Sequence, residues 1–319
     1  MRIKIGIVGY GNLGKAVEQE VLKNKNLKLV AIFSRRLVVS AFNTPIEQYD
    51  DYIKYVGKID VMMMCGGSIS DIEMQLPEIS KYFCTINSFD NHSKIESLIT
   101  EISKINKENK TISISSCGWD PGIFSLIRSL MFAISQEKPI SFWGKGISMG
   151  HSDAIRQLDN VEDAVQFTVP NKKAVSLAKK QQLVEGQPLH FRECFVVAKE
   201  SYHKRIDQEI KNIPNYFKGQ PTNVTFVKDI ELAKLKSKMI HQGRLVCSFK
   251  LNTKQKASFE FIAKMDSNPN FTARIMVAYI SALIKLISLK RFDAFLPIDI
   301  PISFLFDKKE KSFIINNLC

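Results

Sequence analysis

Short apolar runs alternate with amphipathic helical segments over the first third of the chain. The runs are rich in Ile and Val and have the length of strands, and the segments between them place apolar residues on one side of a helix. We expect strands over residues 3–8, 28–33, 59–65, up to 87 and 111–115, and helices over 12–23, 71–82 and 95–106. Parallel strands joined by crossover helices produce this alternation, which predicts an α/β fold with a doubly wound parallel sheet.

The pattern changes after the turn at residues 118–122. Strands are expected over 191–198 and 222–228, and long helices over 161–184 and 272–289, which indicates an α+β region. The last of these helices repeats apolar residues at helical spacing, so we expect it in a core or at a dimer interface.

The turn is also the expected exit from the first domain. We expect residues 1–118 to bind a dinucleotide and residues 119–289 to form a substrate-binding and dimerisation domain. The stretch from about 290 to 319 is expected to return to the first domain.

Composition and cysteine spacing favour an ordinary globular protein. The chain has 319 residues, of which 45% are hydrophobic and 24% charged. We found no uninterrupted apolar run of the roughly 18 residues that span a bilayer, and we expect a cytoplasmic protein that does not bind membranes. The six cysteines form no C-x-x-C pair and no metal-like spacing with histidine, so no metal site is expected.

The formal net charge of +13 favours anionic partners, because a positive surface concentrates anions. The lysines are scattered along the chain rather than gathered into a stripe with aromatic residues between them, so nucleic-acid binding is not expected. A small anionic molecule remains compatible with this charge, and so does a purely solubilising role.

A glycine-rich segment lies between the first strand and the first helix. It reads Gly9, Tyr10, Gly11, Asn12, Leu13, Gly14. In the G-x-G-x-x-G pattern the first glycine allows a tight turn, the second lets the backbone approach a pyrophosphate, and the third lets helix and strand pack closely. This placement predicts a Rossmann-type dinucleotide site; a turn without a ligand is the alternative.

The second strand ends in Ser34, Arg35 and Arg36, about twenty residues beyond the last glycine of the motif. An NAD-dependent enzyme has an acidic residue at this position to bind the ribose hydroxyls. Two guanidinium groups and a hydroxyl instead match a 2′-phosphate, so we predict NADP as the cofactor. A solvated basic loop is the alternative.

Three later loops are expected to approach the nicotinamide, because ligands of open parallel sheets bind beyond the carboxyl ends of the strands. The residues are Cys65, Gly66, Gly67 and Ser68; Ser88, Phe89 and Asp90; and Cys117, Gly118, Trp119 and Asp120. Asp90 and Asp120 both follow strand ends, where carboxylates can hold an ammonium group or assist proton transfer. A plain Asp-Pro turn is the alternative for Asp120.

Several motifs in register resemble the family of meso-diaminopimelate D-dehydrogenases over about the first 275 residues. Beyond the glycine segment and Ser34–Arg36, they are Asp90–His92, Gly118–Gly122, Phe142–Gly144, Gly150–Ala154, Cys194–Ala198 and Asn268–Ala273. The resemblance implies a homodimeric enzyme of lysine and cell-wall precursor synthesis. It would reversibly deaminate the D-centre of meso-2,6-diaminopimelate to L-2-amino-6-oxoheptanedioate with NADP.

The resemblance also implies roles for individual residues. Asp90 and Asp120 would be catalytic and, with Trp143, would lie near the reacting centre. The distal L-end would be held by Thr168, Arg192, His241 and Asn268, and Met149, Gly150 and Asp153 would also contact the substrate. Such a set suits a molecule with two carboxylates and two ammonium groups.

Two departures from the family pattern keep alternatives open. Met149 stands where the family commonly has glutamine, and residues 228–259 diverge and are more basic. One alternative is another NADP-dependent reductase of amino-acid metabolism, which would not require ammonia in the reductive direction. The other is an NADP-binding protein without turnover.

Overall fold

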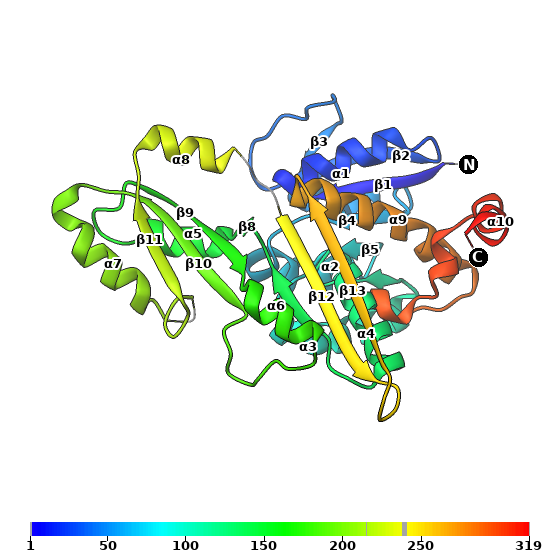
Figure 1. The fold of residues 1–319 in the computed structure, drawn as a ribbon. Coiled ribbons are helices and arrows are strands. Elements are labelled where there is room, and N and C mark those ends of the chain that lie inside the picture. The colour runs from blue at the N-terminus through cyan, green and yellow to red at the C-terminus, as the bar shows by residue number, and fades with distance from the viewer. Residues whose placement is uncertain (1, 215, 238–240, 319) are drawn as a thin grey trace. The chain divides into compact units, whose positions relative to one another are not determined.

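The computed structural model describes residues 2–214, 216–237 and 241–318. The chain forms two compact units (Figure 1). The first contains Met1–Leu126 and Asn268–Cys319, and the second contains Ile127–Ser267. The sequence analysis placed the two crossings after residues 118 and 289, whereas the chain crosses after Leu126 and after Ser267.

A seven-stranded parallel sheet forms the centre of the first unit. Its strands, in spatial order, are β14 (Ala294–Phe295), β6 (Ser113–Ile114), β5 (Cys84–Asn87), β4 (Val61–Met64), β1 (Ile3–Val8), β2 (Leu27–Ser34) and β3 (Ile46–Gln48). The order reverses between β1 and β4, because β2 lies on one side of β1 and β4 on the other. This doubly wound parallel sheet confirms the expected fold class, and the reversal marks the edge where ligands bind.

Helices cover both faces of this sheet. They are α1 (Asn12–Lys23), α2 (Glu73–Ile79), α3 (Ile95–Asn109) and α9 (Asn268–Ser288). The first unit also contains α10 (Lys308–Asn317), which buries none of its residues, and α4 (Ile123–Ser135) leads into the second unit. Short turns lie at Tyr49–Tyr55, Ser68–Ile72, His92–Lys94, Pro297–Asp299 and Ile302–Leu305. Strand residues alternate between the faces, so Ile5 and Met63 pack under α1 and α9, whereas Met62 and Met64 pack under α2 and α3.

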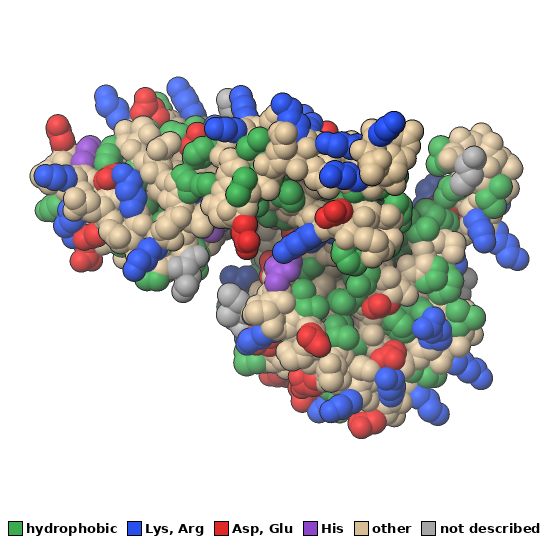
Figure 2. All heavy atoms as spheres, turned by 60° about the horizontal axis from the view of Figure 1, so that its bottom comes forward, with side chains coloured by type: hydrophobic (Ala, Val, Ile, Leu, Met, Phe, Trp, Pro, Cys, Tyr) green, Lys and Arg blue, Asp and Glu red, His purple; other side chains and the backbone are tan. Residues whose placement is uncertain are grey.

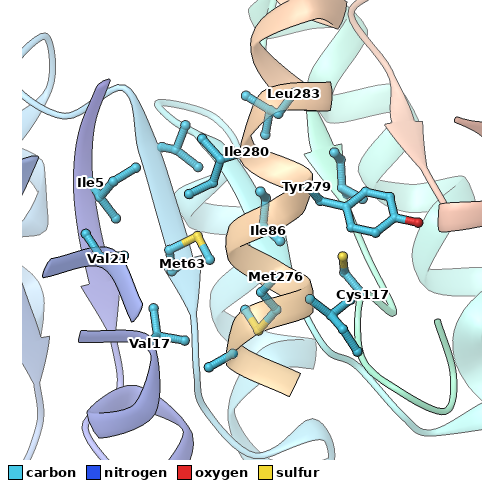
Figure 3. Packing of buried hydrophobic residues seen from close by; sticks show 14 of the residues in the cluster. Ile5, Val17, Val21, Met63, Ile86, Cys117, Met276, Tyr279, Ile280 and Leu283 are labelled. Atoms are coloured by element: carbon cyan, nitrogen blue, oxygen red, sulfur yellow. The ribbon is translucent and has the colours of Figure 1, made fainter. Parts of the chain in front are cut away.

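Helix α9 is the longest apolar element, and it lies in the core of the first unit. Met276, Tyr279, Ile280 and Leu283 of α9 belong to one buried cluster with Ile5 and Met63; in Figure 3 Ile280 lies on the side of α9 that faces Ile5, whereas Tyr279 points to the opposite side. By length and composition it is the one helix of the described chain that is long enough to cross a membrane, although half of its apolar window is buried. Burial against α1 and the sheet accounts for its composition.

The second unit contains two smaller sheets. One has the order β11 (Thr222–Phe226), β10 (His190–Val197), β9 (Asp163–Pro170), β8 (Gly146–Ile147), and the other β13 (Lys256–Met265), β12 (His241–Lys250), β7 (Ile140–Trp143). The helices are α5 (Met149–Arg156), α6 (Lys172–Lys179), α7 (His203–Asn212) and α8 (Asp229–Lys236), with a short turn at Glu200–Tyr202. Most neighbouring strands are antiparallel, which agrees with the expected α+β class.

The prediction of a long helix over residues 161–184 is wrong. Residues 163–170 form β9, and only residues 172–179 are helical as α6. Val165, Phe167 and Val169 alternate with other residues, which is the period of a strand. The side chain of Asn171 then caps α6 by accepting hydrogen bonds from the N–H groups of residues 173 and 174.

Positive charge is dispersed over the surface. Figure 2 shows lysine and arginine side chains spread over the visible face, with acidic side chains among them. On this face the basic side chains are interspersed with acidic and apolar ones.

Candidate active site

Each of the three positions of the motif is occupied by glycine for a different structural reason. Gly9 has φ of +88°, and a Cβ there would lie 3.1 Å from the backbone of Cys65 and Gly66. A Cβ on Gly14 would lie 2.2 Å from the carbonyl oxygen of Gly9, so helix and strand can pack only without it. Gly11 has nothing within 4 Å of its Cβ position, which leaves the start of α1 open to a ligand.

A cleft of about 730 Å³ lies at the carboxyl ends of β1, β2 and β4. Its lining includes nine of the residues expected to bind the cofactor: Gly9, Tyr10, Gly11, Ser34, Arg35, Arg36, Cys65, Gly66 and Gly67. A second hollow of about 480 Å³ adds Asn12 and is bordered by Lys15 and by residues 36–39. The sequence analysis missed Lys15, although it follows the last glycine of the motif directly.

The two arginines of the second loop have different surroundings. Arg35 forms an ion pair with Asp71, whose other carboxylate oxygen accepts the N–H of Gly67 at 2.9 Å. The N–H of Arg36 donates to the hydroxyl of Ser34 at 3.1 Å. Asp71 was missed by the sequence analysis, and only its position four residues after Gly67 marks it. With Arg35 paired, Arg36 is the guanidinium better placed to meet a phosphate.

The loops after β4, β5 and β6 end at the same edge of the sheet. The hydroxyl of Ser68 accepts the N–H of Asp90 at 3.1 Å, which ties two of the loops together. The side chains of Phe89 and Cys117 are fully buried in the core, so any contact of theirs with a ligand would be through the backbone. Asp90 is exposed and Asp120 is partly buried.

The remaining expected cofactor residues lie around this edge. Leu13 packs against the core beneath α1, and Ser88 directly follows β5. A side chain at position 118 would be crowded, because a Cβ on Gly118 would lie 3.2 Å from the carbonyl oxygen of Pro121. Trp119 packs edge to face on Phe124 at 5.4 Å.

In the second unit, strand register brings two of the expected substrate residues together. Arg192 of β10 lies opposite Thr168 of β9. The guanidinium Nη1 of Arg192 donates to the hydroxyl oxygen of Thr168 at 2.8 Å, and its Nε is buried without a partner. An arginine with an open donor in a partly buried place is suited to a carboxylate.

Gln166 of β9 adds to this pair and was missed by the sequence analysis. Its Nε2 donates to the Thr168 oxygen at 3.4 Å, and its Oε1 is buried without a partner. Because the Thr168 oxygen already accepts from two donors, its own hydrogen is left to donate elsewhere. Thr168 and Arg192 therefore present two donors in one place.

Trp143 and His241 lie near each other on neighbouring strands. Trp143 of β7 pairs with Gly243 of β12, two residues after His241. The N–H of Trp143 donates to Nε2 of His190 at 2.7 Å. The following glycine, Gly144, has φ of +100°, and a Cβ there would lie 1.8 Å from the Thr168 carbonyl oxygen, so this loop fits closely against β9.

Two partly buried imidazoles near Arg192 are kept neutral at neutral pH. Burial and the charge of Arg192 lower the pKa of His151 and of His190 to about 4. Burial also lowers the pKa of Arg192. At neutral pH the arginine therefore provides the positive charge here, and the imidazoles are neutral hydrogen-bonding groups.

The positions of the other expected substrate residues give less support to a role in substrate binding. Asp153 is exposed and forms an ion pair with Arg156 within α5. Gly150 is exposed at the start of α5. The side chain of Met149 lies outside the described part of the structure. Asn268 begins α9 in the first unit, where its Oδ1 accepts the hydroxyl of Thr272 at 3.1 Å.

The described residues contain no group of three or more His, Cys, Asp or Glu side chains that could hold a metal ion. The site is instead one of glycine backbone, guanidinium groups and carboxylates. Such groups can bind a phosphorylated nucleotide and a molecule bearing carboxylates and ammonium groups.

Comparison with known proteins identifies close relatives of the chain. Residues 118–267 match the family described as the diaminopimelic acid dehydrogenase C-terminal domain. The meso-diaminopimelate D-dehydrogenase of Acetivibrio thermocellus is 40% identical over 317 residues, which cover 96% of this chain and 95% of that protein.

Two solved structures have the same fold over the whole chain. DAP dehydrogenase of C. glutamicum in complex with DAP matches with a TM-score of 0.89 and 33% identity, covering 99% of both chains. An engineered D-amino acid dehydrogenase bound to NADP+ matches with a TM-score of 0.84 and 31% identity, covering 99% of this chain and all of that one.

Proposed function

The chain belongs to the meso-diaminopimelate D-dehydrogenase family, and on that premise we propose the reaction that it catalyses. It is the NADP-dependent, reversible oxidative deamination of the D-centre of meso-2,6-diaminopimelate to L-2-amino-6-oxoheptanedioate and ammonia. The observation that carries this proposal is 40% identity over nearly the full length of a relative with this name. In the reverse direction the reaction makes a precursor of lysine and of the cell wall.

The first unit fits NADP. The start of α1 is open at Gly11, where backbone N–H groups and the helix dipole suit a pyrophosphate. Arg36, with Arg35 beside it, borders the cleft where a 2′-phosphate would bind. When bound, the nicotinamide supplies the hydride acceptor, and the protein supplies orientation and charge.

We assign the chemistry at the D-centre to Asp90 and Asp120. The reaction removes a hydride from the carbon and a proton from its ammonium group, and water then replaces the nitrogen. Carboxylates at the carboxyl ends of β5 and β6 can hold the ammonium group and accept its proton. Trp143 is assigned to the same end of the substrate.

We assign the distal L-end to Thr168, Arg192, His241 and Asn268, with Met149, Gly150 and Asp153 as further contacts. The strongest support comes from the Thr168–Arg192 pair, whose open donors suit one carboxylate. A substrate with an L-centre at this end and a D-centre at the other would present its reactive C–H bond to the nicotinamide.

The test is a spectrophotometric assay of NADP reduction with separated meso, LL and DD isomers. Two mispaired buried groups cost about 1–3 kcal/mol each, so kcat/KM for DD should be at least about 30-fold below that for meso. The LL isomer should also be poor, because its other C–H bond points away from the ring. NAD in place of NADP serves as the cofactor control. Comparable kcat/KM values for the three isomers would contradict the proposal.

We further propose a homodimer in the cytoplasm. Leu130, Phe132 and Ile134 of α4 are 56%, 50% and 55% exposed, which is unusual for three large apolar side chains on one short helix. Free thiols at the five described cysteines suit a reducing compartment. Light scattering should give twice the chain mass of 36.3 kDa, and Phe132→Glu should give the monomer; a monomeric wild type would contradict the dimer.

A further inference from the structure

A carboxylate is buried beside the cofactor cleft, on the side of α1 that faces away from the solvent. Glu18 is 0% exposed and accepts hydrogen bonds from three hydroxyl groups. Oε2 accepts from Tyr10, and Oε1 accepts from Ser40 at 2.6 Å and from Thr44. Burying a carboxylate is costly unless its oxygens are satisfied, so an arrangement held by hydroxyl donors is sensitive to the loss of any one of them.

These bonds join the glycine motif to the segment 40–44, which directly follows the residues 36–39 that border the second hollow. Tyr10 lies inside the glycine motif, and its hydroxyl oxygen also accepts the N–H of Ala41 at 3.0 Å. The Ser40 hydroxyl oxygen accepts the N–H groups of Phe42 at 3.0 Å and Thr44 at 2.9 Å. The segment from 40 to 44 is therefore fastened to α1 and to the motif through Glu18.

The residues between Arg36 and this anchor have little packing of their own. Leu37 and Val39 are 95% and 88% exposed, and only Val38 is partly buried against the core. Ser34 holds the other end of the segment through the N–H of Arg36. The two anchors thus decide how much of the time Arg36 occupies its place beside the cleft.

We propose that Glu18, with Tyr10, Ser40 and Thr44, is a positioning network that sets the preference for NADP over NAD. The network holds the segment that carries Arg36 against the motif that binds the pyrophosphate, so that one cofactor meets both. This inference rests on the proposed use of NADP. If the hydrogen bonds to Glu18 are lost, Arg36 occupies its place beside the cleft for a smaller fraction of the time. The apparent affinity for a cofactor with a 2′-phosphate then falls in proportion to that fraction.

Two variants weaken the hydrogen bonds to Glu18, one from the glycine motif and one from the 40–44 segment. Tyr10→Phe removes one hydroxyl donor and the acceptor of the Ala41 N–H, and Thr44→Val removes a donor from the loop without changing shape. Each should raise the Kd of NADPH about tenfold and change the Kd of NADH by less than about twofold, as measured by calorimetry. Because Thr44 lies in the loop, its variant still tests the proposal if Tyr10→Phe folds poorly.

Tyr55→Phe is the matched control. It removes a tyrosine-to-glutamate hydrogen bond of 2.7 Å, to Glu47, in the same unit but with neither partner within residues 36–44. We expect no change in the ratio of the two Kd values. Glu18→Gln keeps an acceptor oxygen for Ser40 and Thr44, so it should affect the ratio less than Glu18→Met does.

A double-mutant cycle separates positioning from general loss of stability. In an Arg36→Ala background the network has no guanidinium to position, so Thr44→Val should no longer change the Kd of NADPH. Equal effects of Thr44→Val with and without Arg36 would overturn the inference, and so would equal weakening of NADPH and NADH. A wild type that binds NADH as tightly as NADPH would instead overturn the proposed use of NADP.

Discussion

The two units offer different kinds of group to a charged ligand. In the first unit the glycine motif offers backbone N–H groups at the start of α1, and the rest of the cleft is lined by separate segments between residues 33 and 75. In the second unit Thr168 and Arg192 come from strands 24 residues apart and meet only through antiparallel register. The glycine motif is local and repeats a known pattern, whereas the Thr168–Arg192 pair depends on side chains that the fold must align.

This difference determines how each unit responds to substitution. Backbone recognition is lost when a glycine gains a side chain, but it tolerates changes at neighbouring positions. Side-chain recognition is lost with a single guanidinium or hydroxyl, because the partners are then left buried and unpaired. Four predictions test this contrast, from the largest expected effect to the smallest.

Asp120→Asn should have the largest effect. It keeps the shape of the side chain and removes the charge, so kcat with meso-diaminopimelate should fall by about 100- to 10,000-fold while the Kd of NADPH stays nearly constant. Asp60→Asn, at the amino ends of the strands, is the matched control. Wild-type turnover in the Asp120 variant would show that this residue only forms a turn.

Arg192→Met should affect the substrate rather than the cofactor. Loss of the guanidinium should lower kcat/KM for the meso isomer on the order of 100-fold, and for the DD isomer less, because DD gains little from the pair with Thr168. Arg244→Met removes an ion-paired arginine of the same unit and should change neither value much. Equal losses for both isomers would contradict the assignment of Arg192 to the L-end.

Arg36→Ala should weaken NADP selectively. A charge-assisted hydrogen bond is worth roughly 1.5–3 kcal/mol, so the Kd of NADP should rise about 10- to 150-fold, toward the lower end because Arg36 is exposed. The Kd of NAD should stay nearly unchanged, and Arg291→Ala in the same unit should change neither. Equal weakening of NADP and NAD binding would contradict the assignment of Arg36 to the 2′-phosphate.

The smallest expected effect is on the pH dependence of the free energy of unfolding of the second unit. His151 and His190 protonate near their ordinary pKa of 6.5 when unfolded but only at about 4 when folded, so the unfolded chain binds more protons between these values. Their contribution to the free energy of unfolding is therefore complete above pH 6.5 and is lost as the pH falls toward 4.

Urea unfolding at pH 7, 6 and 5 measures this loss. The slope should be no more than about 1.4 kcal/mol per pH unit for each histidine, and less because both rings are only partly buried. His190→Gln keeps an acceptor for the Trp143 N–H and should flatten the dependence. The exposed His92→Asn should leave it unchanged, and an unaltered slope in His190→Gln would contradict the prediction.

The sequence by itself determined the first unit well. The period of its apolar runs and the glycine motif predicted β1 and α1 to the residue, because a parallel sheet buries both faces of its strands and leaves continuous apolar runs. The glycine motif was predictable because its backbone geometry depends on a few neighbouring residues. The short strands β3 and β14 were not expected, since two or three residues carry no periodic signal.

Only the tertiary structure decided the rest. It showed that residues 163–170 are a strand, that Arg35 is paired with Asp71, and that Gln166 lies behind the Thr168–Arg192 pair. It also revealed that Glu18, in sequence an ordinary charged helix residue, is buried among hydroxyl groups. The alternation of Val165, Phe167 and Val169 does mark the strand in the sequence, but the contacts of Arg35 and Glu18 join segments far apart in the chain and leave no periodic pattern there.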